Sequence, residues 1–194
     1  MTPPLTTYLD PGILGSGLSV FAGKDLYGAA YVPNPVDKAA SSLARRVAMA
    51  RALVEKLDAW GIASRDIVAV GVEDPQILDS RHQSTAKQRA DPNDLLNLPG
   101  VTAAFAALLG GLPPEALYSV KPGEWKENID KNVMCARIWG RLTPVERARV
   151  ERLPARQKAV DPDAVPGGLM HNALDAIGIG LHFLGRLERV RVFG

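Results

Sequence analysis

Short apolar segments separated by turn residues mark the N-terminal part of the chain. Residues 6–11, 17–23 and 26–32 are mainly apolar and small residues, and Gly-rich or Lys-Asp turns separate them. Such a pattern is typical of consecutive strands joined by tight turns. We therefore expect the chain to open with a three-stranded antiparallel meander, with Asp10 near the end of its first strand.

The period of the apolar residues changes after residue 37. Within residues 37–60 they recur at helical spacing, followed by Gly61 as a stop signal; they are Leu43, Val47, Ala50, Val54 and Leu57. Residues 67–72 are short and continuously apolar, which favours a buried strand parallel to the first. Glu73 follows at the end of this predicted strand.

The second half of the chain contains further predicted elements. A long polar loop (74–94) comes first, followed by a small helix (101–109), a strand (116–121) and a helix (128–142). After these come a charged, Pro-containing arm or extension (143–167) and a final helix (169–187). The final helix carries Leu174, Ile177, Leu181 and Leu184 on one face. Strands mixed with helices in this way predict an α/β fold with one mixed five-stranded sheet flanked by helices.

Composition limits the number of domains and the classes of partner that the chain can have. The chain has 194 residues, 46% of them hydrophobic and 23% charged, which suits one soluble globular domain. The formal charge of +2 does not by itself indicate a polyanionic partner, but residues 119–158 hold ten basic and five acidic residues. The extra basic residues either contact the phosphates of a nucleic acid or lie on a solvated helical face.

Cysteine usage and hydropathy indicate a compartment. Cys135 is the only cysteine, so an intrachain disulfide and a cysteine-built zinc site are excluded. The sequence has neither the basic start and apolar run of a signal peptide nor a membrane-spanning run. We expect a reduced, cytoplasmic setting.

Three acidic residues lie in apolar surroundings. Asp10 and Glu73 follow apolar strands, and Asp175 lies between Ala and Leu on one side and Ala and Ile on the other in the final helix. Unpaired buried carboxylates are costly, so the set suggests a shared cation. Each residue alone also has a structural interpretation, as a turn signal or a solvated strand end.

Carboxylates that converge from different segments suit Mg²⁺ or Mn²⁺. Two such ions can activate a water and stabilise the leaving oxygen in phosphodiester cleavage. His171 lies four residues before Asp175 and Asn172 lies three before it, so either projects near Asp175 on the helix and is a candidate fourth ligand.

These motifs resemble the RuvC family of Holliday-junction resolvases, within the RNase H-like superfamily. The resemblance spans roughly residues 6–187 and rests on Leu9-Asp10-Pro11-Gly12, Gly17-Leu18-Ser19-Val20, Val70-Gly71-Val72-Glu73 and the closing segment from His171 to Leu181. Each motif is short, and the closing helix is the most specific of them.

The resemblance implies a metal-dependent endonuclease that resolves branched DNA by paired nicks as a homodimer. Asp10, Glu73, Asp175 and a fourth residue would be catalytic and would hold two Mg²⁺ or Mn²⁺ ions. Residue type favours His171 as the fourth member, whereas the family's spacing favours Asn172.

Candidate DNA contacts are basic residues and one aromatic residue: Arg81, Lys87, Arg89, Lys121, Trp125, Lys126 and Lys131. Trp125 has the alternative role of anchoring a turn to the core. The family's Gly-rich basic motif is replaced by the segment from Pro122 to Lys126, and the segments 74–94 and 143–167 also depart from the usual pattern. By resemblance, these departures suggest a phage-type member, which implies the cytoplasm of a bacterial or phage-infected cell. They leave the junction specificity open.

Three other functions compete with a junction resolvase. The first is a nuclease for flaps, forks or RNA–DNA hybrids. The second is a sugar-kinase or actin-like ATPase, whose chains are normally much longer and have two such domains. The third is a non-catalytic DNA-binding relative, against which the retention of all three carboxylates argues.

Overall fold

The structure is a computed structural model that describes residues 3–74, 92–126, 129–152 and 164–187, without the side chains of residues 92–97. In these ranges five strands form one sheet in the order β3-β2-β1-β4-β5. The strands are β1 Leu5–Asp10, β2 Gly15–Ala22, β3 Asp25–Pro33, β4 Ile67–Glu73 and β5 Leu117–Val120. β1, β2 and β3 form the predicted antiparallel meander, whereas β4 is parallel to both β1 and β5.

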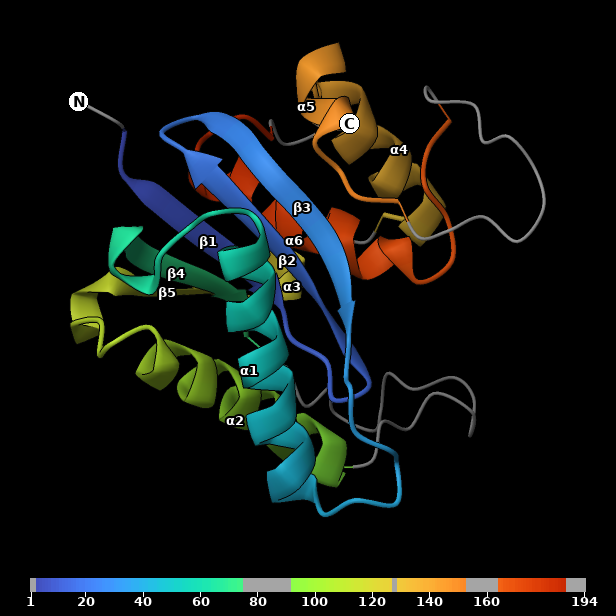
Figure 1. The fold of residues 1–194 in the computed structure, drawn as a ribbon. Helices are drawn as coiled ribbons and strands as arrows, with labels where there is room; N and C mark the ends of the chain where they lie inside the picture. Colours follow the sequence, from blue (N-terminus) through green and yellow to red (C-terminus); the bar gives the residue numbers. More distant parts are fainter. Residues whose placement is uncertain (1–2, 75–91, 127–128, 153–163, 188–194) are drawn as a thin grey trace.

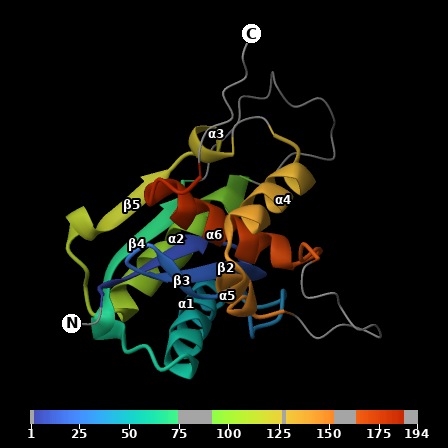
Figure 2. The same ribbon diagram turned by 90° about the horizontal axis from the view of Figure 1, so that it is seen from above.

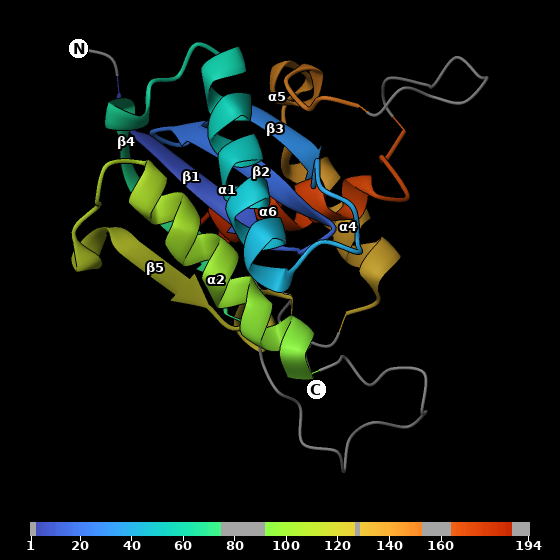
Figure 3. The ribbon, with the colours of Figure 1, turned by 60° about the horizontal axis from the view of Figure 1, so that its bottom comes forward.

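Helices cover both faces of this sheet (Figure 1). They are α1 Ser42–Ala59, α2 Pro92–Leu108, α3 Pro122–Trp125, α4 Lys131–Arg141, α5 Pro144–Ala148 and α6 Met170–Phe183. α1 and α2 lie side by side over one face, and α6 lies on the other with α4 outside it (Figures 2 and 3). The mixed five-stranded sheet flanked by helices is therefore confirmed.

Alternation along the strands produces a separate apolar core on each face. Leu5 and Leu9 of β1 pack in the core beneath α1 and α2, whereas Tyr8 packs in the core beneath α6. This is the expected result of side chains pointing alternately to the two faces of a strand. The same alternation places Asp10 on the face that α6 covers.

The first predicted helix differs from α1 at its N-terminus. α1 begins at Ser42 because the Ser41 side chain accepts a hydrogen bond from the Ala44 amide at 3.2 Å, a typical N-cap contact. Leu43 is 67% exposed, so the predicted apolar face was wrong at that residue. The buried face includes Met49, which the predicted face lacked.

α2 is longer than the small helix predicted at 101–109. It runs from Pro92 to Leu108 and includes Pro99 and Gly100, two residues that ordinarily disfavour a helix interior. Residues 92–94, which were predicted to belong to the loop 74–94, are therefore part of a helix. Residues 75–91 lie outside the described part of the chain.

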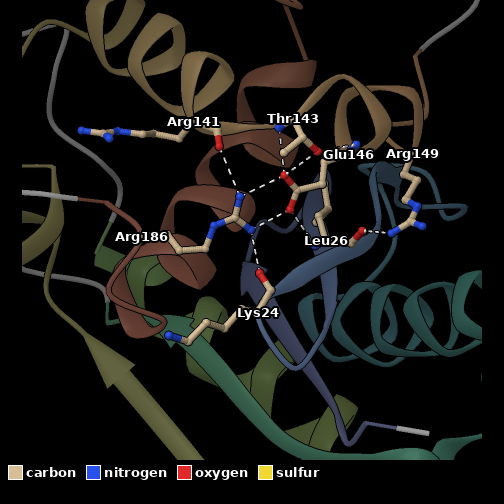
Figure 4. A network of polar contacts seen from close by, with 7 residues as sticks. All are labelled: Lys24, Leu26, Arg141, Thr143, Glu146, Arg149 and Arg186. Atoms are coloured by element: carbon tan, nitrogen blue, oxygen red, sulfur yellow. Dashed lines mark hydrogen bonds and ion pairs between the residues drawn. The ribbon is translucent and has the colours of Figure 1, made fainter.

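Residues 143–151 belong to the body of the fold and not to an arm or extension. The Glu146 carboxylate accepts hydrogen bonds from the Leu26 amide at 2.9 Å and from Arg186 at 2.6 and 2.9 Å (Figure 4). Val150 forms a parallel bridge with Ala29 of the edge strand β3. These contacts correct the prediction for this part of 143–167; residues 153–163 lie outside the described ranges.

The final helix agrees with the prediction in its apolar face. Leu174, Ile177 and Leu181 are fully buried, and Leu184 packs partly buried against the same core. Every residue from Ala173 to Leu181 is buried, so α6 is covered on all sides along that stretch. In the described part of the chain no helix is both long and apolar enough to cross a membrane.

Candidate active site

Strand register places Asp10 and Glu73 next to each other. Leu9 of β1 pairs with Val72 of the parallel strand β4, and each acidic residue is the next one along its strand. Neighbouring strands lie about 4.8 Å apart, and residues with matching alternation point to the same face. Both carboxylates therefore lie on the α6 face at the carboxyl ends of the two central strands.

α6 brings Asp175 to the same place. The helix lies close to β2 because Gly17 has no side chain: a Cβ there would lie 1.8 Å from the Asn172 carbonyl oxygen. The buried Ser19 hydroxyl donates to the Ala176 carbonyl at 2.9 Å, which fixes the helix beside Asp175. Asp175 itself is only 6% exposed.

Lys126 lies between two of these carboxylates. Its Nζ is 2.8 Å from Glu73 Oε2 and 3.1 Å from Asp175 Oδ2. The indole Nε1 of the preceding Trp125 donates to the same Glu73 oxygen at 3.0 Å. The last residue of the short helix α3, Trp125, and its C-cap residue, Lys126, thus supply two donors to the site.

The electrostatics of the site are those of crowded acids. Burial, followed by repulsion from Asp175 and Glu73, raises the pKa of Asp10 to about 8. Burial by itself would lower the pKa of Lys126, but Asp175 and Glu73 raise it overall. The site therefore stabilises positive charge strongly.

The chemistry of the donors, and not their present spacing, fits a hard divalent cation. Across the described ranges, no group of three or more His, Cys, Asp or Glu side chains that could hold a metal ion is found. The three converging groups are all carboxylates, which Mg²⁺ and Mn²⁺ prefer. The Lys126 ammonium already takes the cationic place between two of them, which shows that a cation is stabilised there.

The first turn of α6 contains both candidates for the fourth residue. The Asn172 side-chain amide donates to the Gly15 carbonyl at 3.3 Å, so it contacts β2. His171 is partly buried at the beginning of the helix. Its role as the fourth ligand stays a prediction, with Asn172 as the alternative.

The predicted DNA contacts have different outcomes. Arg81, Lys87 and Arg89 lie outside the described residues, whereas Lys121 and Lys131 are exposed. Lys131 is close enough to Asp10 to lower its pKa. Trp125 is only 2% exposed and its ring lies in the apolar core, as its predicted alternative role of a core anchor requires. Its contact with nucleic acid stays a prediction.

Lys126, whose nucleic-acid contact stays a prediction, makes a contact that the sequence did not indicate. We expected a phosphate contact, but its ammonium is bound to two carboxylates of the site. The sequence drew attention to Trp125 and Lys126 because an aromatic and a basic residue stand side by side. It carried no signal that both side chains turn inward to Glu73.

Comparison with known proteins supports the fold. No protein-family model matches the chain, and no curated protein matches its sequence significantly. Among solved structures, Thermus thermophilus RuvC in complex with a Holliday junction substrate superposes with a TM-score of 0.54 at 19% identity, covering 94% of this chain and 95% of that chain. A second Thermus thermophilus RuvC structure gives a TM-score of 0.51 at 16% identity, covering 95% and 98%. The chain therefore has an RNase H-like fold that resembles RuvC.

Proposed function

We propose that this protein is a metal-dependent endonuclease that cleaves phosphodiester bonds in branched DNA, with four-way junctions as its preferred substrate. The observation that carries the proposal is the convergence of Asp10, Glu73 and Asp175 from β1, β4 and α6 at one end of the sheet. Three carboxylates from separate elements are unfavourable together unless a cation is bound among them.

Each residue has a defined part in this proposal. Asp10, Glu73 and Asp175 would hold two Mg²⁺ or Mn²⁺ ions, with His171 or Asn172 as a fourth member. When bound, such ions supply activation of the attacking water and charge stabilisation on the leaving oxygen. Trp125 holds one Glu73 oxygen by its hydrogen bond and so orients that carboxylate.

The substrate class rests on resemblance and charge. The RuvC structure with a TM-score of 0.54 is of a complex with a Holliday junction substrate. In the present chain Lys121 and Lys131 are exposed, Lys131 acts on the charge of Asp10, and both are suited to contact phosphates. A homodimer suits a symmetric junction, because paired cuts require two active sites.

The test is cleavage of a labelled synthetic four-way junction beside matched duplex, flap, fork and RNA–DNA hybrid substrates. Reactions contain Mg²⁺, Mn²⁺ or EDTA and use the wild type, Asp10→Asn and Asp175→Asn. Asp58→Asn is the matched control, because Asp58 is exposed on α1 away from the site. We expect symmetric, metal-dependent nicks at the junction that both site variants lose and the control retains.

Other outcomes separate the alternatives. Metal-dependent cleavage of flaps, forks or hybrids without preference for the junction would support the alternative nuclease. The proposed substrate would then be wrong, and the proposed metal-dependent chemistry would stand. Absence of cleavage of every substrate in either metal would overturn the nuclease proposal. Saturable ATP binding would then favour an ATPase, and junction binding without cleavage would favour a DNA-binding protein.

A further inference from the structure

The side chain of Lys126 contacts carboxylates from two different elements of the fold. Two other ion pairs of the described residues, Lys56 with Glu151 and Arg186 with Glu146, serve as a comparison. By contrast, Lys126 bridges Glu73 of β4 and Asp175 of α6, with Asp10 close enough to affect its charge.

The position of the ammonium is fixed on several sides. It lies 4.7 Å from the centre of the Trp125 ring, in addition to its contacts with the two carboxylates. The side chain is 25% exposed, so the charge lies inside the site and not above it. An aromatic face attracts a cation, which adds to the two ion pairs.

We propose that Lys126 is a resident counter-ion of the carboxylates, which a divalent cation must displace in order to bind. Without metal, the ammonium joins Glu73 and Asp175 and offsets their repulsion. With metal, the same oxygens turn to the new cation and the ammonium moves away. Lys126 thereby sets a low affinity for metal in the free protein. This inference rests on the proposed function, because the displacing cation is the one that cleavage requires.

The competition follows from charge and space. Mg²⁺ binds oxygens at about 2.0–2.1 Å, whereas the ammonium now lies at 2.8 and 3.1 Å from two of the same oxygens. A divalent cation and an ammonium held by the same oxygen would be within about 5 Å of each other and repel strongly at low dielectric. The divalent cation and the Lys126 ammonium therefore cannot both remain bound to these oxygens at their preferred distances.

Calorimetric titration of the full chain with Mn²⁺ and with Mg²⁺ tests this, comparing the wild type with Lys126→Met and Lys126→Arg. We expect Lys126→Met to bind metal about tenfold more tightly or better, because one competing charge is gone. Its Tm without metal should fall, and Lys126→Arg should bind as weakly as the wild type. Lys56→Met is the matched control: Lys56 is 28% exposed in a 2.8 Å ion pair far from the site and should not change the affinity.

A measurement on the wild type does not depend on how the variant folds. Labelling by an amine-reactive reagent, read by mass spectrometry, should be slow at Lys126 without metal and faster when metal is added. The exposed Lys38 serves as an internal reference whose labelling stays constant.

The outcomes separate this inference from the proposed function. Metal binding by the wild type, with equal or weaker binding by Lys126→Met and unchanged labelling of Lys126, would overturn the displacement and leave the nuclease proposal standing. Absence of metal binding by both proteins would overturn the two together.

Discussion

The indole Nε1 of Trp125 donates a 3.0 Å hydrogen bond to the Oε2 atom of Glu73. The ring of Trp125 also lies against Gly178 of α6, where an added Cβ would be only 2.3 Å from the ring. Trp125 therefore connects the strand that carries Glu73 to the helix that carries Asp175. This contact fixes the distance between two carboxylates that belong to different elements.

Replacing Trp125 with Phe should weaken metal binding, because the ring is largely kept while the hydrogen bond that orients Glu73 is lost. We expect an apparent affinity for Mn²⁺ about threefold to tenfold lower by calorimetry, equivalent to about 1 kcal/mol. Trp60→Phe is the matched control, since Trp60 Nε1 donates to Glu151 away from the site at 2.6 Å. An equal loss of affinity in both variants would contradict a specific role for Trp125.

Replacing Asp10 with Asn should stabilise the metal-free protein at alkaline pH. The pKa of Asp10 in the folded protein is raised from 3.8 to about 8, so its neutral form is favoured by folding. That contribution is fully present below about pH 3.8 and is lost as the pH rises through 8. Asn is permanently neutral and avoids this loss. The free energy of unfolding of Asp10→Asn at alkaline pH should therefore exceed that of the wild type by roughly 2–4 kcal/mol.

The measurement is Tm against pH in EDTA for wild type and Asp10→Asn. The two curves should converge near pH 4 and separate progressively towards pH 9, with the variant higher by about 5–10 °C. Parallel Tm curves of the two proteins over the whole pH range would show that folding does not raise the pKa of Asp10.

Removing the charge of Glu146 should reduce stability at neutral pH and flatten the response to acid. Burial by itself would raise the pKa of Glu146, but hydrogen bonds from Arg186, Leu26 and Thr143 lower it from 4.5 to about 2. The stabilisation is therefore present above about pH 4.5 and is lost as the pH falls towards 2.

We expect Glu146→Gln to lower the free energy of unfolding by roughly 3 kcal/mol at pH 7, because Arg186 loses its charged partner in a buried pair. Urea unfolding at pH 7 and at pH 3 measures both effects. Glu151→Gln removes a carboxylate that is 46% exposed and should cost less than about 1 kcal/mol. A larger loss in Glu151→Gln than in Glu146→Gln would contradict this assignment.

A methyl group at Gly178 should destabilise the protein, whereas one at Gly140 should not. At Gly178 the added Cβ would meet Trp125 at 2.3 Å and Ile138 at 2.8 Å, so Gly178→Ala overpacks the core by about 2 kcal/mol. Gly140 lies in α4 with nothing within 4 Å of an added Cβ, and Gly140→Ala should stabilise by about 0.5–1 kcal/mol. Thermal unfolding of the two variants checks the contrast, and similar Tm changes would refute it.

Sequence patterns predicted most elements because those patterns are local. The apolar segments of β1 to β4 and the helical spacing in α6 depend on residues close in the chain. The acids Asp10, Glu73 and Asp175 stood out for a related reason: a charged residue in an apolar segment is costly to bury and therefore conspicuous. The N-termini of α2 and α1 were misplaced, because Pro99, Gly100 and Leu43 gave misleading local signals.

By itself, the sequence thus determined the strand and helix pattern and the three candidate carboxylates. Only the tertiary structure decided how they meet, because the deciding contacts join residues far apart in the chain. Lys126 reaches Asp175 across 49 positions, Trp125 reaches Glu73 across 52, and Ser19 reaches Ala176 across 157. No periodicity within a short window records such contacts. The inward turn of Trp125 and Lys126, and the docking of Glu146 onto the edge strand, followed from packing alone.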